Sequence, residues 1–491
     1  MLPTRTERRG SGASPVTEER RSDRGCSVVR MQWLFVVSDQ ASPPNRRTIR
    51  PASTDATEPP MSPTEINAIL ARTHPAAAAL LSPLGRRAAL PEGIPQQTEQ
   101  ARRCERQATI GEITDGTGVP LTLPSLSRHF TELNPTVALR YAPQRGLTAL
   151  RTAWRDHLAK DGIGGVDGAP ASLPLVTTGI THAMSLCAEL FCAPGTPVLI
   201  ATPYWDNYDT IFEMRTAGDI RTFPFYDADG GYNVAGLRAA LAALTGPAMV
   251  VLNFPANPTG YTPRVDEIPA LVEAITRHPL PLAVLCDDAY QGLQFEPGAH
   301  APSVYGPLAR AADPTRTLVC KVDGATKELV FFGGRVGFLT FSATGEAAEA
   351  LGEKAAALIR SSISSGPAPS QAAVLAALQS GRIEAEQSAV LTILRDRYLA
   401  LKEAFRANDL IPAPHNSGCF AYLPLPAGVD AEAFRQRLIT EHSVGVIAIR
   451  PTNGIRIAFC SIEAADIPDL VARVAGALRR SSPEGTHPSG G

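Results

Sequence analysis

Short apolar runs alternate with helical stretches between residues 197 and 341, and this alternation constrains the fold more than any other feature of the chain. Strands that are apolar along their whole length are buried on both faces, which is typical of a mainly parallel sheet covered by helices. We therefore expect an α/β fold built on such a sheet. The runs are PVLIAT (197–202), AMVVLNF (248–254), PLAVLC (281–286), RTLVCKV (316–322) and RVGFLTF (335–341), with helical stretches at 234–244 and 266–278.

The ends of the chain differ from this middle part. Residues 1–60 are rich in Arg, Ser, Pro and Thr, with WLFVV (33–37) as their one apolar run, and we expect a disordered extension before Met61. Residues 481–491 are expected to be a disordered tail. Between them, 146–160 is predicted to be a helix that places Leu147, Leu150, Trp154 and Leu158 on one face, and 181–193 is predicted to be another.

Composition excludes several classes of protein. The net charge of −2 gives no reason to expect nucleic acid or an anionic membrane as a partner, and no apolar run approaches the roughly 20 residues of a membrane helix. The eight cysteines form no CxxC pair, and several lie in apolar runs. We therefore expect reduced, buried thiols in a cytoplasmic protein, with neither a disulfide framework nor a metal site.

Polar, turn-forming segments follow four of the predicted strands. Because ligand sites in such sheets lie at the carboxyl ends of the strands, we expect these segments to meet. They present a Trp, an Asn, an Asp with a Tyr, and a Lys, whereas metal-ligand spacing, GxGxxG, Walker and GxSxG motifs are absent from the sequence. The segments are PYWDNY (203–208), PANPTG (255–260), DDAYQG (287–292) and DGATKE (323–328).

These side chains match the needs of pyridoxal phosphate (PLP). Its aldehyde needs a lysine amine to form a Schiff base, and its pyridinium nitrogen needs a carboxylate so that the ring acts as an electron sink. Its phenolic oxygen needs hydrogen-bond donors, and its ring face needs an aromatic side chain. Its phosphate needs a helix N-terminus and an arginine.

At this point the chain resembles the class I/II aminotransferase family of fold-type I PLP-dependent enzymes, with motifs similar to those of aspartate aminotransferases. The matching motifs follow the family's order from Gly111 to Arg456, roughly 70% of the chain. They are YAPQRGLTALR (141–151), TTGIT (177–181), NPTG (257–260), DDAYQG (287–292), a lysine followed by an arginine eight residues later, and IRIAF (455–459).

The resemblance implies a role for each matching residue. Lys327 would be the Schiff-base lysine and the base for the proton shift. Asp287 would pair with the pyridinium nitrogen, with Asn257 and Tyr290 on the phenolic oxygen. The remaining implied residues are Trp205 on the ring face, Arg335, Thr178, Gly179 and Ile180 on the phosphate with Tyr141 from the partner chain, Arg456 on the substrate carboxylate, and Gly111 beside the substrate.

Two of these assignments have rivals nearby in the sequence. Tyr204 is adjacent to Trp205 and could be the stacking residue instead. Arg450 lies six residues before Arg456 and could be the arginine that binds the carboxylate. The motif offsets favour Trp205 and Arg456.

Two further points concern the segments that contain Lys327 and Asp287. Many family members have a serine three residues before the lysine, whereas this chain has Gly324, and Thr326 could compensate by contacting the phosphate. Asp288, next to Asp287, fits a helix cap better than Asp287 does.

The substrate is less defined. Arg360 lies 33 residues after Lys327 and resembles the arginine that aspartate aminotransferases use across the dimer for a side-chain carboxylate. In that role it would favour glutamate, aspartate and 2-oxoglutarate, whereas the alternative is an arginine that caps a helix end. Aromatic and other amino acids stay open.

The resemblance also implies the architecture and activity. We expect a large PLP-binding domain at 140–365, an N-terminal arm and part of a small domain at 61–139, and the rest of the small domain at 366–480. Tyr141 and Arg360 imply a homodimer. The implied reaction is ping-pong transamination between an L-amino acid and a 2-oxo acid. Alternatives are another PLP enzyme (β-lyase, decarboxylase or oxidase) or an aminotransferase-like regulator.

Overall fold

A seven-stranded sheet forms the centre of the part of the chain that the computed structural model describes, residues 61–90, 93–165 and 167–480. The predictions for 1–60 and 481–491 lie outside the described residues. The strand order is β2-β8-β7-β6-β5-β3-β4, and all neighbours are parallel except those of β8, which is antiparallel to both β2 and β7. The strands are β2 (Leu175–Thr177), β3 (Pro197–Thr202), β4 (Asp219–Pro224), β5 (Ala248–Asn253), β6 (Leu282–Asp287), β7 (Thr317–Gly324) and β8 (Gly337–Phe341).

The predicted α/β fold is confirmed, and each of the five apolar runs matches one of these strands to within two residues at either end. The sequence did not indicate β2 or β4. β2 has only three residues, and β4 is an edge strand in which Phe223 alone is buried, so neither shows a continuous apolar run.

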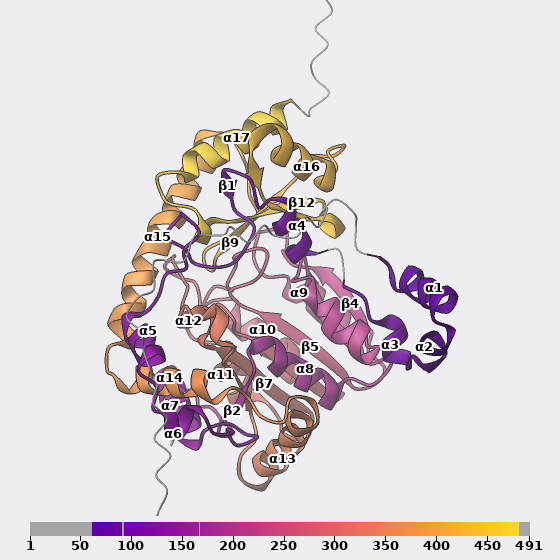
Figure 1. Cartoon of the computed structure of the whole chain (residues 1–491), viewed down its shortest axis with the longest axis vertical. Helices are drawn as coiled ribbons and strands as arrows, with labels where there is room; N and C mark the ends of the chain where they lie inside the picture. Colours follow the sequence, from indigo (N-terminus) through magenta and orange to yellow (C-terminus); the bar gives the residue numbers. More distant parts are fainter. Residues whose placement is uncertain (1–60, 91–92, 166, 481–491) are drawn as a thin grey trace, which may run out of the picture. The chain divides into compact units, whose positions relative to one another are not determined.

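β3, β5 and β6 are apolar up to their last residue because helices cover both faces of the sheet (Figure 1). In β5, Met249 and Val251 pack into a cluster with residues of α8 and α13, while Val250 and Leu252 pack into a second cluster with residues of α7, α9, α10 and α11. The helices are α7 (Thr148–Ala159), α8 (Ile180–Phe191), α9 (Val234–Ala242), α10 (Ile268–Thr276), α11 (Tyr305–Ala311) and α13 (Gly345–Ser362), and a single turn, α12 (Ala325–Glu328), follows β7.

A second, antiparallel sheet of three strands forms near the C-terminus, in the order β11-β12-β9. Gln97 ties the N-terminal segment to this sheet by exchanging two hydrogen bonds with the backbone of Ala448. The elements after the large sheet are α14 (Ala368–Gln379), α15 (Ile383–Ala407), β9 (Phe420–Pro424), α16 (Ala431–His442), β10 (Val444–Gly445), β11 (Ile447–Ile449), β12 (Gly454–Ala458) and α17 (Ile467–Arg479).

The N-terminal elements divide their contacts. β1 pairs in parallel with β10, whereas α5 packs on α14 and Arg87 donates to the carbonyl of Met214 beside the large sheet. The predicted domain boundaries therefore stay a prediction. The elements are α1 (Pro63–Thr73), α2 (Pro75–Leu80), α3 (Pro83–Arg87), α4 (Ile94–Gln100), β1 (Arg106–Gln107), α5 (Pro124–Thr131) and α6 (Pro135–Ala138).

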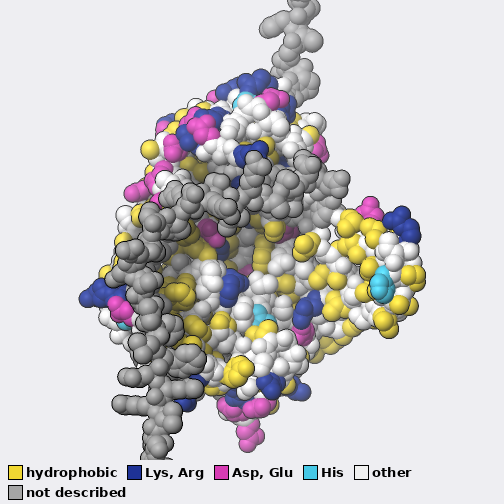
Figure 2. Space-filling view, viewed as in Figure 1, with side chains coloured by type: hydrophobic (Ala, Val, Ile, Leu, Met, Phe, Trp, Pro, Cys, Tyr) yellow, Lys and Arg dark blue, Asp and Glu magenta, His cyan; other side chains and the backbone are white. Residues whose placement is uncertain are grey.

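Apolar side chains gather on the surface over α1–α3 (Figure 2), and Leu80 and Leu90 are more than four-fifths exposed. None of the described helices combines the length and the apolar character needed to cross a membrane. All seven cysteines in the described part of the chain are buried, and none of them is paired with another.

Candidate active site

A cavity of about 240 Å³ lies where the carboxyl ends of β5, β6 and β7 meet β9 and β12. Nine of the residues selected from the sequence line it: Gly111, Ile180, Trp205, Asn257, Asp287, Tyr290, Lys327, Arg335 and Arg456. The strand-end segments therefore converge as expected. Its other lining residues are Ile94, Thr181, Met184, Asn253, Ala289, Thr326 and Phe420.

Lys327 stands on α12, directly after β7. Its Nζ donates a 2.5 Å hydrogen bond to the carbonyl of Gly111 and lies 4.9 Å from the ring centre of Phe332. Burial lowers the pKa of Lys327, because the cavity wall removes water from the charged amine. A lowered pKa increases the fraction of neutral amine, which is the nucleophilic and basic form.

Asp287 is the last residue of β6 and is 2% exposed. The hydroxyl of Tyr208 donates to Oδ2 at 2.5 Å, and the backbone N–H of Ala289 donates to Oδ1 at 3.2 Å. Burial raises the pKa of Asp287 to about 7, and these two hydrogen bonds act in the opposite direction. A cationic partner in the cavity would favour the ionised carboxylate.

Asn253 fixes the loops that follow β5 and β6. Its side-chain amide donates to the carbonyl of Asp287 at 2.9 Å, and its side-chain oxygen accepts from the N–H of Asn257 at 2.8 Å. One side chain thus sets the positions of two residues that line the cavity.

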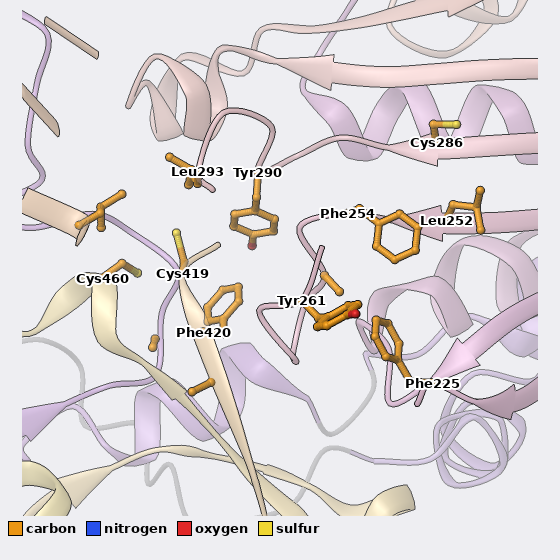
Figure 3. Packing of buried hydrophobic residues seen from close by; sticks show 14 of the residues in the cluster. Phe225, Leu252, Phe254, Tyr261, Cys286, Tyr290, Leu293, Cys419, Phe420 and Cys460 are labelled. Atoms are coloured by element: carbon orange, nitrogen blue, oxygen red, sulfur yellow. The ribbon is translucent and has the colours of Figure 1, made fainter. Parts of the chain in front are cut away.

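Tyr290, in the turn after β6, lies beside Phe420 on β9 (Figure 3). Their ring centres are 5.4 Å apart at 80°, an edge-to-face contact. A Cβ at Gly111 would lie 2.7 Å from Phe420 Cζ, so only glycine leaves room for this ring beside Lys327. Gly111 therefore shapes the cavity by lacking a side chain.

Arg456 lies on β12 and is 1% exposed. Its Nη1 donates to Asn257 Oδ1 at 2.9 Å, its Nη2 donates to the carbonyl of Thr109, and its guanidinium stacks 4.3 Å from the ring centre of Phe420. Its buried Nε has no hydrogen-bond partner among the described residues. The group is rigidly held and retains donor capacity for an anion.

The rival arginine is placed differently. The side chain of Arg450 is 43% exposed and lies beside Glu432 at 3.5 Å, and Arg450 is not among the residues that line the cavity. The other rival, Tyr204, donates to Asp209 at 2.8 Å, whereas Trp205 lines the cavity. The geometry favours Trp205 and Arg456 as the residues that face a ligand.

One end of the cavity fits a phosphate. A Cβ at Gly179, whose φ is +80°, would lie 2.2 Å from Arg335 Nη2, so the guanidinium lies against bare backbone at the start of α8. The hydroxyls of Thr178 and Thr326 are buried there without hydrogen-bond partners in the described part of the chain. A guanidinium, two unpaired hydroxyls and the N-terminus of a 12-residue helix are a suitable donor set for a phosphate.

Four residues selected from the sequence are not among those that line the cavity: Thr178 and Gly179, which directly precede the lining residue Ile180, and Tyr141 and Arg360. Tyr141 is 93% exposed, and Arg360 is exposed on α13, where its guanidinium donates to Ser364 Oγ at 2.5 Å. Both are expected to act on the partner chain, and that expectation stays a prediction.

Sequence reasoning missed Asn253, Tyr208, Phe420 and Ile94. Asn253 could have been found, because it is a polar residue at the end of an apolar run. Tyr208 lies within a strand-end segment but carried no signal of its own. Ile94 and Phe420 reach the cavity through tertiary packing, which no local pattern indicates.

Comparisons with known proteins identify the family of the chain. The family model described as "Aminotransferase class I and II" matches residues 109–474. An aspartate aminotransferase of Geobacillus stearothermophilus is 25% identical over 199 residues, 40% of this chain and 48% of that protein. The "Probable N-succinyldiaminopimelate aminotransferase DapC" of Mycobacterium tuberculosis is 29% identical over 322 residues, 63% of this chain and 73% of that protein.

Solved structures share the fold. The structure of the aspartate aminotransferase of Thermus thermophilus with maleate superposes with a TM-score of 0.66 at 22% identity, covering 79% of this chain and 97% of that one. At this identity the likeness concerns the fold, including the sheet that positions the strand-end segments.

Proposed function

Because the chain belongs to the class I and II aminotransferase family, we propose that it is a PLP-dependent enzyme that moves the amino group of an L-amino acid to a 2-oxo acid. The observation that carries the proposal is the shared cavity of Lys327, Asp287, Tyr290 and Arg456. It brings together an amine, a buried carboxylate, a phenol and a guanidinium that no structural role requires at one place.

The chain's residues fit the cofactor at each of its functional groups. Lys327 would hold the aldehyde, Asp287 the ring nitrogen, Tyr290 and Asn257 the phenolic oxygen, and Trp205 the ring face. PLP, when bound, supplies an electron sink that stabilises negative charge next to the amino group. The phosphate would meet the donor set of Arg335, Thr178, Thr326, Gly179 and Ile180.

Lys327 is the residue that moves the proton. Its amine is free to accept a proton once the substrate amine has replaced it, and burial has already lowered its pKa toward the operating range of a base. The Gly111 carbonyl and the Phe332 ring stabilise the protonated form when it arises. Asp287 would keep the ring nitrogen protonated by accepting a hydrogen bond from it, which requires the Asp287 carboxylate to be ionised when the cofactor is bound.

Arg456 would bind the substrate α-carboxylate, with its position fixed by Asn257 and Phe420. For the substrate pair we propose glutamate with 2-oxoglutarate, or aspartate. The support is that similar proteins carry the name aspartate aminotransferase and that Arg360 is the residue that would meet a side-chain carboxylate from the partner chain. We further propose a cytoplasmic homodimer in which Tyr141 and Arg360 serve the partner's cavity.

The first experiment is an absorption spectrum of the purified protein with PLP, followed by separate additions of L-glutamate, L-aspartate and an aromatic amino acid. We expect visible absorbance that a preferred donor converts to the pyridoxamine form and that a 2-oxo acid restores. Lys327→Ala should lack the visible band and turnover. Intermediates without the pyridoxamine form would instead indicate a lyase or decarboxylase, and a protein that ignores PLP would refute the proposal.

A further inference from the structure

A second charged cluster lies on the sheet face opposite the cavity. Lys321, in the middle of β7, is 1% exposed, and its Nζ lies 2.6 Å from Asp288 Oδ2 and 3.0 Å from Asp323 Oδ2. Asp288 follows β6 and Asp323 belongs to β7, so one ammonium group joins the carboxyl ends of two strands.

Strand geometry separates this cluster from the cavity. Side chains alternate between the two faces of a strand, so Asp288 points away from the face that Asp287 uses. In the β6–β7 register, Cys286 pairs with Lys321 and Asp287 pairs with Val322. Asp288 of the cluster is the next residue after Asp287, which lines the cavity. Asp323 of the cluster lies four residues before Lys327, which also lines the cavity.

The carboxylates have further partners that fix them. Ser303 Oγ donates to Asp288 at 2.6 Å, and Trp154 Nε1 lies 3.2 Å from both oxygens of Asp323. The Trp154 ring stacks on Phe338 at 4.0 Å between ring centres. Each carboxylate is thus oriented by the lysine and by one neutral donor.

The turn that carries Lys327 is anchored on the same side. The carboxylate of Glu328, the next residue, lies 2.5 Å from His157 Nε2 on α7, and its carbonyl accepts from Gln387 Nε2 at 3.2 Å. Only three residues separate Asp323 from Lys327, so a displacement of Asp323 would also displace the turn that carries Lys327.

We propose that Lys321 is a positioning residue of the active site: by joining Asp288 to Asp323 it sets the separation of Asp287 and Lys327. This inference rests on the proposed function, since the two positioned groups are those that would hold PLP. The inference goes beyond the proposed function because it assigns a role to Lys321, which does not line the cavity.

The physical basis is the balance of buried charge. One cation faces two carboxylates, and its removal would leave both carboxylates buried without that charge. Burial raises the pKa of Asp288 and of Asp323, and Lys321 opposes that rise in each. The other titratable groups that interact with the cluster are His157, Asp161, Cys286, Asp287, His300, Tyr305 and Glu328.

The test compares Lys321→Met with the double variant Lys321→Met/Asp323→Asn, which restores the net charge of the cluster. Two readouts are made: the Tm of the PLP-free protein, and the affinity for PLP with the pH midpoint of its visible absorbance. Lys321→Met should lower Tm, weaken PLP binding by at least about tenfold, and raise the midpoint by about half a pH unit, because a nearby cation is lost. The double variant should recover more than half of each change.

Lys402→Met is the matched control, because Lys402 forms an ion pair with Glu296 at the surface. It should leave PLP affinity and the midpoint unchanged. If Lys321→Met binds PLP within twofold of the unaltered protein with the same midpoint, the proposal is overturned. If the unaltered protein binds no PLP, the proposed function fails instead, and the two failures are thereby distinguished.

Should Lys321→Met not fold, Trp154→Phe decides. It removes the N–H beside Asp323 and keeps an aromatic ring on Phe338. PLP binding weakened by about threefold or more supports the proposal, and unchanged binding overturns it.

Discussion

Asp287 and Asp288 are neighbours at the end of β6 and are both buried, yet their surroundings are opposite. Asp287 faces the cavity with two neutral donors, Tyr208 and the Ala289 N–H, and none of the described cations lies within ion-pair distance of it. Asp288 faces the other side of the sheet and is paired with Lys321 at 2.6 Å. Asp287 thus has only neutral donors as partners, whereas Asp288 already has a cation.

The difference shows how a strand end separates chemistry from support. Alternation places consecutive side chains on opposite faces, so one face can hold groups whose charge needs an incoming partner while the other fixes the backbone beneath them. Buried groups with shifted pKa values are candidates for function. Of these two carboxylates, only that of Asp287 lacks a cationic partner among the described residues, and it is therefore the one that indicates a ligand.

The largest expected effect is on turnover. Asp287→Asn should lower kcat on the order of 10²–10³-fold, because an amide cannot hold the ring proton by charge. Asp288→Asn should lower kcat by less than about tenfold but reduce stability by about 2–4 kcal/mol, because it leaves Lys321 with one carboxylate. Steady-state kinetics and thermal unfolding of both variants check this.

Equal losses of kcat in the two variants would show that the faces are not separated as proposed. The Tyr208 hydroxyl can donate to the amide oxygen of the Asp287→Asn variant as well, so the comparison isolates the charge of the pocket carboxylate rather than its shape.

The next effect is a pH dependence of the PLP-free protein. The folded pKa of Asp287, about 7, lies above the unfolded value near 4, so the folded state binds more protons in this window and its stability falls as pH rises through it. Asp287→Asn lacks this penalty. The free energy of unfolding of Asp287→Asn, minus that of the unaltered protein, should therefore increase on the order of 2–3 kcal/mol from pH 5 to pH 8. Denaturant unfolding at both pH values measures it.

Asp313 provides the control of opposite sign. Hydrogen bonds from the Thr315 hydroxyl and N–H lower its pKa, so it stabilises the protein above the unfolded pKa and that contribution is lost as pH falls. The loss of unfolding free energy caused by Asp313→Asn should therefore become smaller at low pH. Added PLP should weaken the effect at Asp287 and leave that at Asp313 unchanged.

The contrast between the two faces also explains what the sequence could predict. Asp287, Tyr290, Asn257 and Lys327 follow apolar runs, and the rule that sites lie at strand ends is enough to predict that they meet. By sequence Asp288 fits a helix cap, whereas the structure shows an ion pair with Lys321. That pair depends on the register of β6 with β7, which local patterns do not specify.

The missed residues have the same cause. Phe420 reaches Tyr290 from β9, about 130 residues later in the chain, and Ile94 reaches the cavity from α4. Neither lies in a pattern that requires a ligand. The motifs thus predict the groups that perform chemistry, whereas packing determines the walls that surround them.

A smaller effect should separate the two candidate arginines. Arg456→Lys should lower kcat/KM by about 10–100-fold, mostly through KM, because lysine cannot make the paired hydrogen bonds of a guanidinium to a carboxylate. Arg450→Lys should change kcat/KM by less than about twofold, since the Arg450 side chain is 43% exposed beside Glu432. Similar losses in both variants would contradict the assignment of Arg456.

The smallest effect concerns Arg360, which lies outside the cavity of its own chain. If it serves the partner's cavity, Arg360→Ala should lower kcat/KM about 3–10-fold for glutamate and aspartate and leave aromatic donors unchanged, because the loss is one solvent-screened ion pair. Mixing Arg360→Ala chains with inactive Lys327→Ala chains tests the dimer directly. Hybrid dimers combine an intact Lys327 with the partner's intact Arg360, so preference for dicarboxylates should return. If the hybrid dimers show the same substrate selectivity as Arg360→Ala alone, Arg360 does not act across the interface.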